Sequence, residues 1–229
     1  MLKRVIFFCL LSLFSYFSIV AEASDSRWKM YYSTARDVGY YDTQTVTTNP
    51  GKQFVKVWAK VLNKNTGRTG AVQAIIDYPE QTIMVVGYVK NQNGRPTYQR
   101  LARPIITPVI PDSLDERFTR VVAQQVGRSP MYAGGPNRWK TIRVAASYRL
   151  LIATDCGLYN SLTKQYAVWI KQTSRKPGPT IKHYFCDLNN GTVGTTALNG
   201  KPPVPESDEE AILNGARKLY QSGNGYNII

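Results

Sequence analysis

An alternating pattern of side chains between residues 53 and 62 constrains the fold of this chain more than any other feature. Val55, Val57, Ala59 and Val61 share one parity, and Lys56, Trp58 and Lys60 share the other. A period of two is typical of a strand with one buried face. Further β-prone runs follow at 71–77, 82–89, 142–154, 165–173 and 180–186. We therefore predict a largely antiparallel β-sheet.

Two segments carry the signals of a helix start. Ser113 with Glu116, and Ser207 with Glu210, have the spacing of a capping box. The second start leads into an apolar stripe at helical spacing: Ile212, Leu213, Ala216, Leu219 and Tyr220. The predicted fold is therefore α+β, an antiparallel sheet packed against a C-terminal helix, with a long insertion at 63–146 that contains a further helix. The proline-rich segment 101–111 is expected to be a loop.

Residues 1–23 have the three parts of a secretory signal peptide. Lys3 and Arg4 are followed by an almost continuously apolar run from Val5 to Val20, and Ala21-Glu22-Ala23 offers small residues to a signal peptidase. Retention as a membrane anchor is the alternative, although the run is short of the ~20 residues that a spanning helix needs. We expect 24–229 to be a single exported domain, in the periplasm or on the outer cell surface, with a flexible tail at 221–229.

The exported domain is strongly basic. The whole chain has a net charge of +14, and loss of the signal peptide leaves 27 basic and 14 acidic side chains, a net charge of +13. Such a surface attracts acidic proteins, acidic glycans or lipid headgroups. Because the chain is exported, no nucleic acid partner is expected. No later apolar run is long enough to span a membrane, so no transmembrane segment is expected after processing.

Two cysteines remain in the processed chain, Cys156 and Cys186. An even number in an exported protein favours a disulfide, which would close a loop of about 30 residues. Two buried thiols are the alternative. A zinc site is disfavoured, because His183 is the only histidine and no CxxC motif is present.

Enzymatic motifs are absent from the sequence. It contains no glycine-rich phosphate loop, no nucleophile elbow and no metal-binding helix motif. The lone His183 is expected to be a packed strand residue, and the carboxylates at 206–210 are explained by a helix start. We expect a protein that is not an enzyme, with no cofactor and no metal, although a small secreted hydrolase with a cleft at His183 is one reading.

Basic and aromatic residues gather around the alternating strand. Lys56 and Lys60 project to one face, about 13 Å apart at ~3.3 Å per residue, with Trp58 between them. Lys64 and Arg68 follow in the adjoining turn. Two cations around an aromatic side chain suit contact with an acidic partner. A solvated, inert surface is the alternative.

One segment is similar in sequence to a later segment of the chain. Residues 52–60 (KQFVKVWAK) are similar to residues 164–171 (KQYAVWIK), with a tryptophan shortly before a lysine in both. Either the chain contains an internal duplication, or two amphipathic strands look alike by chance.

Three short blocks, covering about 80 residues, together resemble the surface-adhesin protein E family. The first block consists of Trp28-Lys29, Tyr40-Tyr41-Asp42 with Val46, and the strand from Val55 to Lys60. The second is Ser147-Tyr148-Arg149-Leu150 with Asp155-Cys156, and the third is Pro203-Val204-Pro205-Glu206-Ser207 with the helix after it. The chain departs from the family in the long segment 63–146 and in the lack of a cysteine in the last helix.

The resemblance implies a small antiparallel sheet with one helix against it. It also implies display at the bacterial outer surface and binding of host matrix proteins such as vitronectin or laminin. No binding residue of the family is carried over to this chain. The expected function is non-catalytic binding at the cell envelope, possibly adhesion. The alternative is a periplasmic accessory or structural subunit of an envelope assembly.

Overall fold

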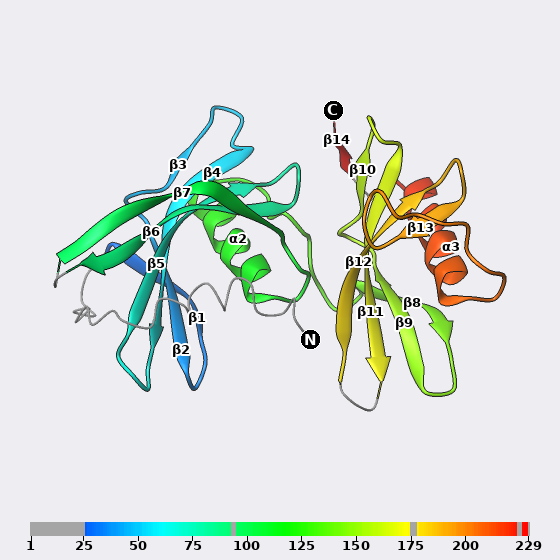
Figure 1. The fold of residues 1–229 in the computed structure, drawn as a ribbon, viewed down its shortest axis with the longest axis horizontal. Coiled ribbons are helices and arrows are strands. Elements are labelled where there is room, and N and C mark those ends of the chain that lie inside the picture. The colour runs from blue at the N-terminus through cyan, green and yellow to red at the C-terminus, as the bar shows by residue number, and fades with distance from the viewer. Residues whose placement is uncertain (1–25, 93–94, 175–177, 224–225, 229) are drawn as a thin grey trace. The chain divides into compact units, whose positions relative to one another are not determined.

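The chain forms two compact units in a computed structural model (Figure 1). The structure describes residues 26–229 except 93–94, 175–177, 224–225 and 229, so the expected signal peptide lies outside the described residues. Unit 1 ends at Met131 and unit 2 begins at Tyr132. This division differs from the expected single domain with an insertion at 63–146. That segment instead completes unit 1 and begins unit 2.

Unit 1 is built on a seven-stranded antiparallel sheet of order β1-β2-β4-β5-β6-β7, with β3 also paired to β4. Its strands are β1 (Trp28–Ser33), β2 (Asp37–Asp42), β3 (Thr47–Thr48), β4 (Phe54–Asn63), β5 (Thr69–Asp77), β6 (Thr82–Gln92) and β7 (Arg95–Pro108). The expected loop at 101–111 therefore lies mostly in β7. The prolines are tolerated because β7 is an edge strand, where ladder N–H groups are not all needed.

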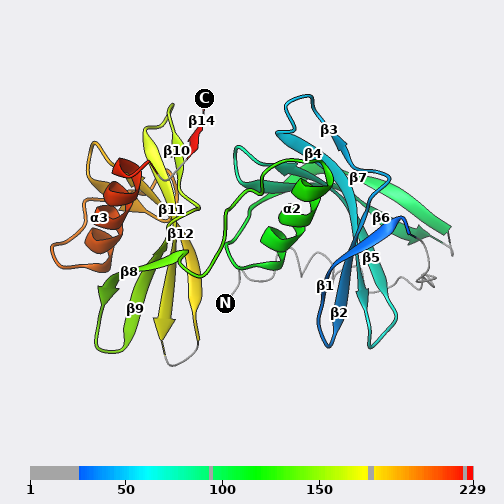
Figure 2. The same cartoon turned by 180° about the vertical axis from the view of Figure 1, so that it is seen from behind.

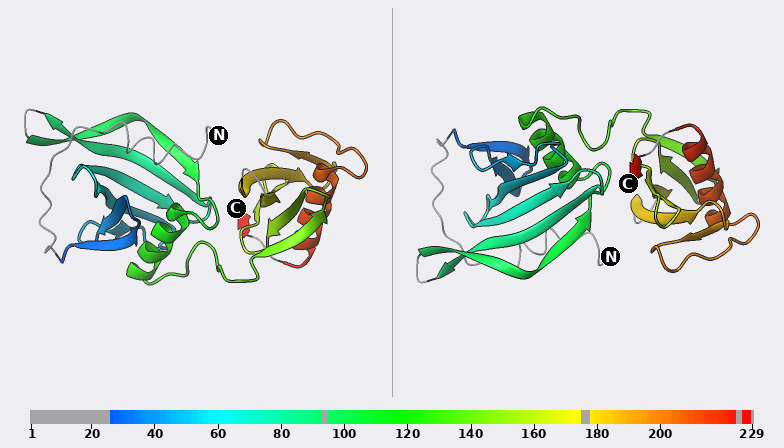
Figure 3. Two further views of the ribbon diagram at one scale, coloured as in Figure 1. Left: turned by 90° about the horizontal axis from the view of Figure 1, so that it is seen from below. Right: turned by 90° about the horizontal axis from the view of Figure 1, so that it is seen from above.

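Helix α2 (Leu114–Gln125) packs on one face of this sheet, as two further views show (Figure 3). The Phe118 ring lies 5.0 Å from the ring of Tyr31 on β1, and the Tyr78 hydroxyl donates to the Thr119 carbonyl at 2.8 Å. Val55 and Val57 of β4 are fully buried on this side. The apolar parity of the alternating strand thus forms the core of unit 1.

Unit 2 holds a second seven-stranded sheet, of order β13-β12-β11-β10-β14, in which β9 also pairs with β11 and β8 with β9. Its strands are β8 (Trp139–Val144), β9 (Tyr148–Ala153), β10 (Leu158–Asn160), β11 (Gln165–Ser174), β12 (Thr180–Asp187), β13 (Thr192–Gly194) and β14 (Tyr226–Ile228). All pairs are antiparallel except β10–β14. The segment expected to be a flexible tail thus contains a short strand.

Helix α3 (Asp208–Gln221) lies against the sheet of unit 2, as the view from behind also shows (Figure 2). Its buried Ile212, Leu213 and Ala216 share one core cluster with Ile152 and Val168 of the sheet. The stripe found in the sequence is therefore the buried face of the helix. Tyr220, at the end of the stripe, is instead an exposed residue.

The two units are built to one plan. Every described residue pair of β1–β2, β2–β4 and β3–β4 has a counterpart 111 positions later in β8–β9, β9–β11 and β10–β11, as Trp28 and Trp139 illustrate (139 − 28 = 111). The match includes the irregularity in the edge hairpin, which falls after Met30 in unit 1 and after Thr141 in unit 2. Chance resemblance of two amphipathic strands does not produce a shared register over several strands. We conclude that the chain contains an internal duplication.

The helix starts repeat as well. The Ser113 and Ser207 side chains each accept a hydrogen bond from the backbone N–H three residues later. In both copies the glutamate of that position, Glu116 or Glu210, accepts from the N–H of the residue before the cap serine, a variant of the capping box. The residue before each cap, Asp112 or Glu206, has a positive φ, of 62° and 60° respectively. This unusual conformation in both copies supports the duplication, because it is rarely adopted by residues other than glycine.

Candidate functional site

The predicted binding strand places its cations on the side of the sheet that faces away from α2. Val55, Val57, Ala59 and Val61 face the core, so the alternate positions Lys56, Trp58 and Lys60 share the opposite face. We call this side, opposite to α2, the open face of unit 1. The structure thus brings the three central residues of the prediction together, with Lys56 exposed and the other two half-buried.

Lys60 is held between aromatic rings of neighbouring strands. Its Nζ lies 4.0 Å from the centroid of Trp28 on β1 and 5.4 Å from that of Tyr40 on β2. The sheet register explains this arrangement, because Tyr40 is the direct ladder partner of Lys60. A cation over an indole face is an attractive contact. Lys60 is therefore positioned by the sheet with its charge near the surface.

Trp58 belongs to a second group of contacts on the open face. Its ring lies 5.6 Å from that of Tyr98 on β7, edge to face, and the Tyr98 hydroxyl donates to the Gln73 side chain at 3.1 Å. Tyr98 reaches Trp58 by crossing over Gly87, where a Cβ atom would come within 2.5 Å of the tyrosine ring. A glycine at this position thus lets an aromatic side chain lie flat across the sheet.

The open face also exposes large apolar side chains. One row of ladder partners crosses this face from β4 to β7, and it consists of Lys56, Ile75, Met84 and Ile106. Four apolar residues on it remain substantially in solvent: Met30 (57% exposed), Phe54 (43%), Tyr98 (46%) and Ile106 (58%). The solvent face of an antiparallel sheet is usually polar, and exposed apolar side chains gathered on one face indicate an interaction surface.

The two outer members of the predicted site lie elsewhere. Lys64 and Arg68 belong to the turn between β4 and β5, at the end of the strand. The Lys64 Nζ donates to the Ser33 hydroxyl at 2.9 Å and to the Thr34 carbonyl at 2.6 Å, which ties this turn to the one between β1 and β2. We conclude that Lys64 has a structural role in joining the two turns.

An ion pair neutralises a buried carboxylate beside this region. Arg27 Nε donates to Asp42 Oδ2 at 2.8 Å, and the Asp42 side chain is fully buried. Burial alone would raise the pKa of Asp42, but hydrogen bonds from Arg27 and from the Gln44 N–H outweigh it and lower the pKa. Asp42 is therefore ionised and compensated by Arg27.

Unit 2 has equivalents of Trp28, Trp58 and Lys60 at the same ladder positions, but Ala167 stands at the position of Lys56. Lys171 Nζ lies 4.9 Å from the ring centroid of Trp139. This contact is equivalent to that of Lys60 with Trp28, where the distance is 4.0 Å. Trp169 is the counterpart of Trp58, but it is only 3% exposed and is stacked on His183 at 4.3 Å. Burial lowers the pKa of His183 to about 4. The imidazole is therefore neutral at pH 7 and packs as an aromatic side chain.

The two cysteines differ from the predicted disulfide. Both are buried, and they are not joined by a disulfide bond. The Cys156 thiol donates to Asp155 at 3.0 Å, and burial raises the pKa of Cys186 to about 12. Tyr166 is the ladder partner of Cys186, and its hydroxyl lies beside Gly157, next to Cys156. The alternative of two buried thiols is the one that the structure contains.

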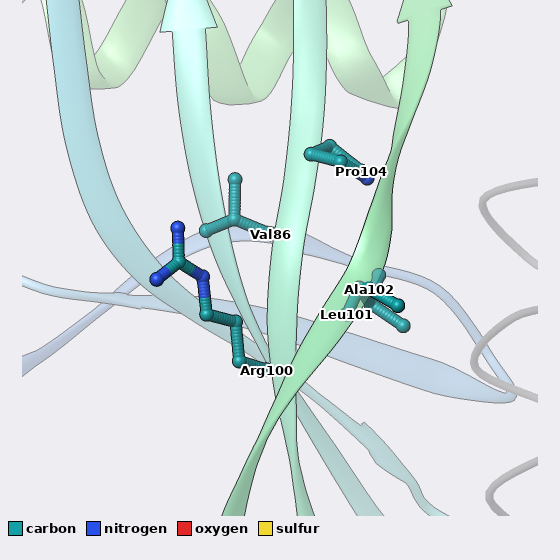
Figure 4. A pocket seen from close by; sticks show the side chains of 5 residues that line it. All are labelled: Val86, Arg100, Leu101, Ala102 and Pro104. Atoms are coloured by element: carbon teal, nitrogen blue, oxygen red, sulfur yellow. The ribbon is translucent and has the colours of Figure 1, made fainter.

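A shallow depression of about 330 Å³ lies where β7 bulges away from β6 (Figure 4). It is lined by Val86, Arg100, Leu101, Ala102 and Pro104. Its lining offers one cation and no carboxylate or imidazole, so it lacks an acid–base pair. Among the described residues, no group of three or more His, Cys, Asp or Glu side chains is placed to hold a metal ion. In the same part of the chain no helix is both long and apolar enough to cross a membrane.

No protein-family model, no curated protein and no solved structure matches this chain. The resemblance to the surface-adhesin protein E family therefore rests on the three sequence blocks. The structure divides those blocks between the units: the first lies in unit 1, and the other two lie in unit 2.

The residues that contact Trp58 and Lys60 were not predicted. Trp28, Tyr40 and Tyr98 come from strands far from β4 in the sequence, and alternation identifies a face without its neighbours. One signal was available: the tripeptide Arg-Trp-Lys occurs at both 27–29 and 138–140. This repeat marks Trp28 and Trp139 as equivalent positions.

Proposed function

We propose that this chain is an exported, non-catalytic binding protein of the bacterial cell envelope, and that it acts as an adhesin. Its partner is an acidic host matrix protein, which binds the open face of unit 1. The observation that carries the proposal is the combination of Lys56 and Lys60 with exposed apolar side chains on one face of a sheet. Export and display at the surface are inferred from the N-terminal signal pattern and from the family resemblance.

The exposed apolar side chains of the open face favour a protein partner over a glycan. Met30, Phe54 and Ile106 are exposed side chains with no polar groups of their own. They gain free energy by contact with other apolar side chains, at roughly 25 cal/mol per Å² buried. A protein surface supplies apolar side chains together with carboxylates, whereas a highly hydrated acidic glycan supplies mainly charge.

Charge reversal tests the proposal. Residues 24–229 would be purified with Lys56→Glu and Lys60→Glu together, and binding to immobilised vitronectin and laminin would be measured at several salt concentrations. We expect at least about tenfold weaker binding at low salt, which corresponds to ~1.4 kcal/mol. The difference should shrink as salt screens the contact. Circular dichroism would verify the fold of the variant.

A matched control carries the same change of charge on the other side of the sheet. Lys29 and Lys90 are exposed and have the opposite parity to Trp28 and Val89, which lie on the open face. Lys29→Glu with Lys90→Glu should bind almost as the wild type does. Equal losses in both double variants would show that net charge, not the open face, is responsible. If the wild type ignores both matrix proteins and co-purifies with envelope proteins, it is the accessory subunit of the alternative.

A further inference from the structure

The tryptophans of this chain are confined to two equivalent clusters. The whole sequence contains four, namely Trp28, Trp58, Trp139 and Trp169. Trp28 and Trp58 lie on the open face of unit 1, and the other two occupy the same ladder positions of unit 2. Tryptophan is the side chain most enriched at the centres of protein interfaces. The restriction of all four tryptophans to two repeated positions points to a role that the duplication has kept.

The cation is repeated together with the rings. Lys60 lies over Trp28 at 4.0 Å and Lys171 over Trp139 at 4.9 Å, each from the strand that carries the second tryptophan of its unit. The arrangement needs three strands in the same register in both units. It is therefore a property of the repeated unit and not of a local sequence similarity.

The clusters also differ, because Ala167 and Leu151 of unit 2 stand at the positions of Lys56 and Tyr40. In unit 1 the second tryptophan is half-buried and faces Tyr98, whereas in unit 2 Trp169 is buried beside His183. The groups of unit 2 that reach the surface are Trp139 and Lys171, which are both half-buried. Unit 2 thus retains the cation and the indole beneath it, with a smaller exposed aromatic area than unit 1.

We propose that unit 2 carries a second binding site, centred on Lys171 and Trp139, for the same class of ligand as the open face of unit 1. The ligand is an acidic segment of a protein, and one chain binds two such segments. This inference rests on the proposed function. It goes further in assigning two sites to one chain and in predicting weaker binding at unit 2, where less aromatic surface is exposed.

The indole N–H groups give a direct test, because each of the four tryptophans reports on one cluster. Their signals would be assigned by single Trp→Phe substitutions and followed by NMR, while residues 24–229 are titrated at low salt with a capped peptide of eight glutamates. The inference predicts two peptides bound per chain, with shifts of the signals of both clusters. Lys171→Glu should reduce the number bound to one and leave the shifts of Trp28 and Trp58 unchanged.

Controls separate the possible failures. Lys140 follows Trp139, is exposed and has the opposite parity, so Lys140→Glu should leave two peptides bound. If Lys171→Glu does not fold, Lys171→Gln replaces it. Shifts confined to Trp28 and Trp58 would overturn the second site and leave the proposed function intact. No shift of any indole signal in the wild type would overturn both.

Discussion

The only histidine of the chain makes its stability depend on pH in a predictable way. His183 is stacked on Trp169 and lies 4.7 Å from the ring of Phe185, and burial lowers its pKa from 6.5 to about 4. The unfolded chain takes up a proton near pH 6.5, whereas the folded chain does so only near pH 4. Because the unfolded state binds more protons between these values, the stability falls as the pH is lowered through them.

The magnitude follows from the two pKa values. Between pH 7 and pH 4.5, they correspond to a loss of about 2 kcal/mol of unfolding free energy. The duplication supplies the substitution that removes this dependence, since Gln73 occupies the equivalent position of unit 1. Between pH 7 and pH 4.5, the unfolding free energy of His183→Gln should therefore fall by about 2 kcal/mol less than that of the wild type.

Carboxylates also titrate in this range, and their contribution cancels when the wild type is compared with His183→Gln. Burial raises the pKa of Asp115 to about 6, so the folded state takes up that proton first and gains stability as the pH falls. This contribution is the same in the wild type and in His183→Gln. Only the difference between the two proteins measures the histidine.

Urea unfolding at pH 7 and pH 4.5, followed by tryptophan fluorescence, measures the free energies of both proteins. The resonance of the single histidine, titrated by NMR, gives its pKa directly. A folded-state pKa near 6.5, or the same pH dependence in both proteins, would refute the packing of His183 against Trp169.

Three further predictions concern stability and reactivity. Arg138→Ala should lower the free energy of unfolding by about 3–5 kcal/mol, because the Arg138 side chain is 3% exposed and its loss leaves Asp155 without its partner in a buried ion pair; an unchanged free energy in urea unfolding would contradict the burial of this pair. Ser207→Ala removes a helix cap and should lower the free energy of unfolding by roughly 1 kcal/mol. Leu213→Ala removes a buried side chain and should lower it by about 2–5 kcal/mol. An unchanged thermal denaturation of Leu213→Ala would show that α3 is not part of the core. Cys186 should resist alkylation until the protein unfolds, because burial raises its thiol pKa; rapid labelling of the native protein, detected by mass spectrometry, would disprove its burial.

Local signals in the sequence were sufficient for several elements. The alternation at 53–62 corresponds to β4, and both capping boxes begin helices at the expected serines, Ser113 and Ser207. These features depend on a few neighbouring residues and on short-range hydrogen bonds. For that reason they can be predicted from the sequence without knowledge of the tertiary fold.

The domain organisation was not predictable in the same way. The units share their register, but unit 1 inserts the long β6–β7 hairpin where unit 2 has only β13 and the connection to α3. The spacing between equivalent positions is 111 in the first strands and 94 at the helix caps, as Ser113 and Ser207 show (207 − 113 = 94). A changing period hides a duplication when few residues are identical. Much of the supposed insertion at 63–146 is therefore the second half of unit 1.

Only part of the candidate site was predictable from the sequence, for a related reason. Alternation placed Lys56, Trp58 and Lys60 on one face, but it could not show that Trp28 and Tyr98 complete that face. Those contacts depend on strand order and on the close approach at a glycine, which are tertiary features. The role of Lys64 was likewise invisible, because its hydrogen bonds reach a turn about 30 positions earlier.

Our proposal makes the open face of unit 1 the binding surface. Hydroxyl-radical footprinting with mass spectrometry can locate that surface, because the method oxidises exposed apolar and aromatic side chains. The protein would be oxidised alone and in complex with the matrix protein that it binds. We predict that four residues of the open face become protected in the complex: Met30, Phe54, Tyr98 and Ile106.

The chain provides its own controls for this measurement. Leu162, Leu198 and Val204 are also exposed apolar residues, and all three lie in unit 2, outside the strands and the helix. Their oxidation should be unchanged by the partner. Protection of these three residues, with the open face oxidised as in the protein alone, would contradict the account and place the interface elsewhere.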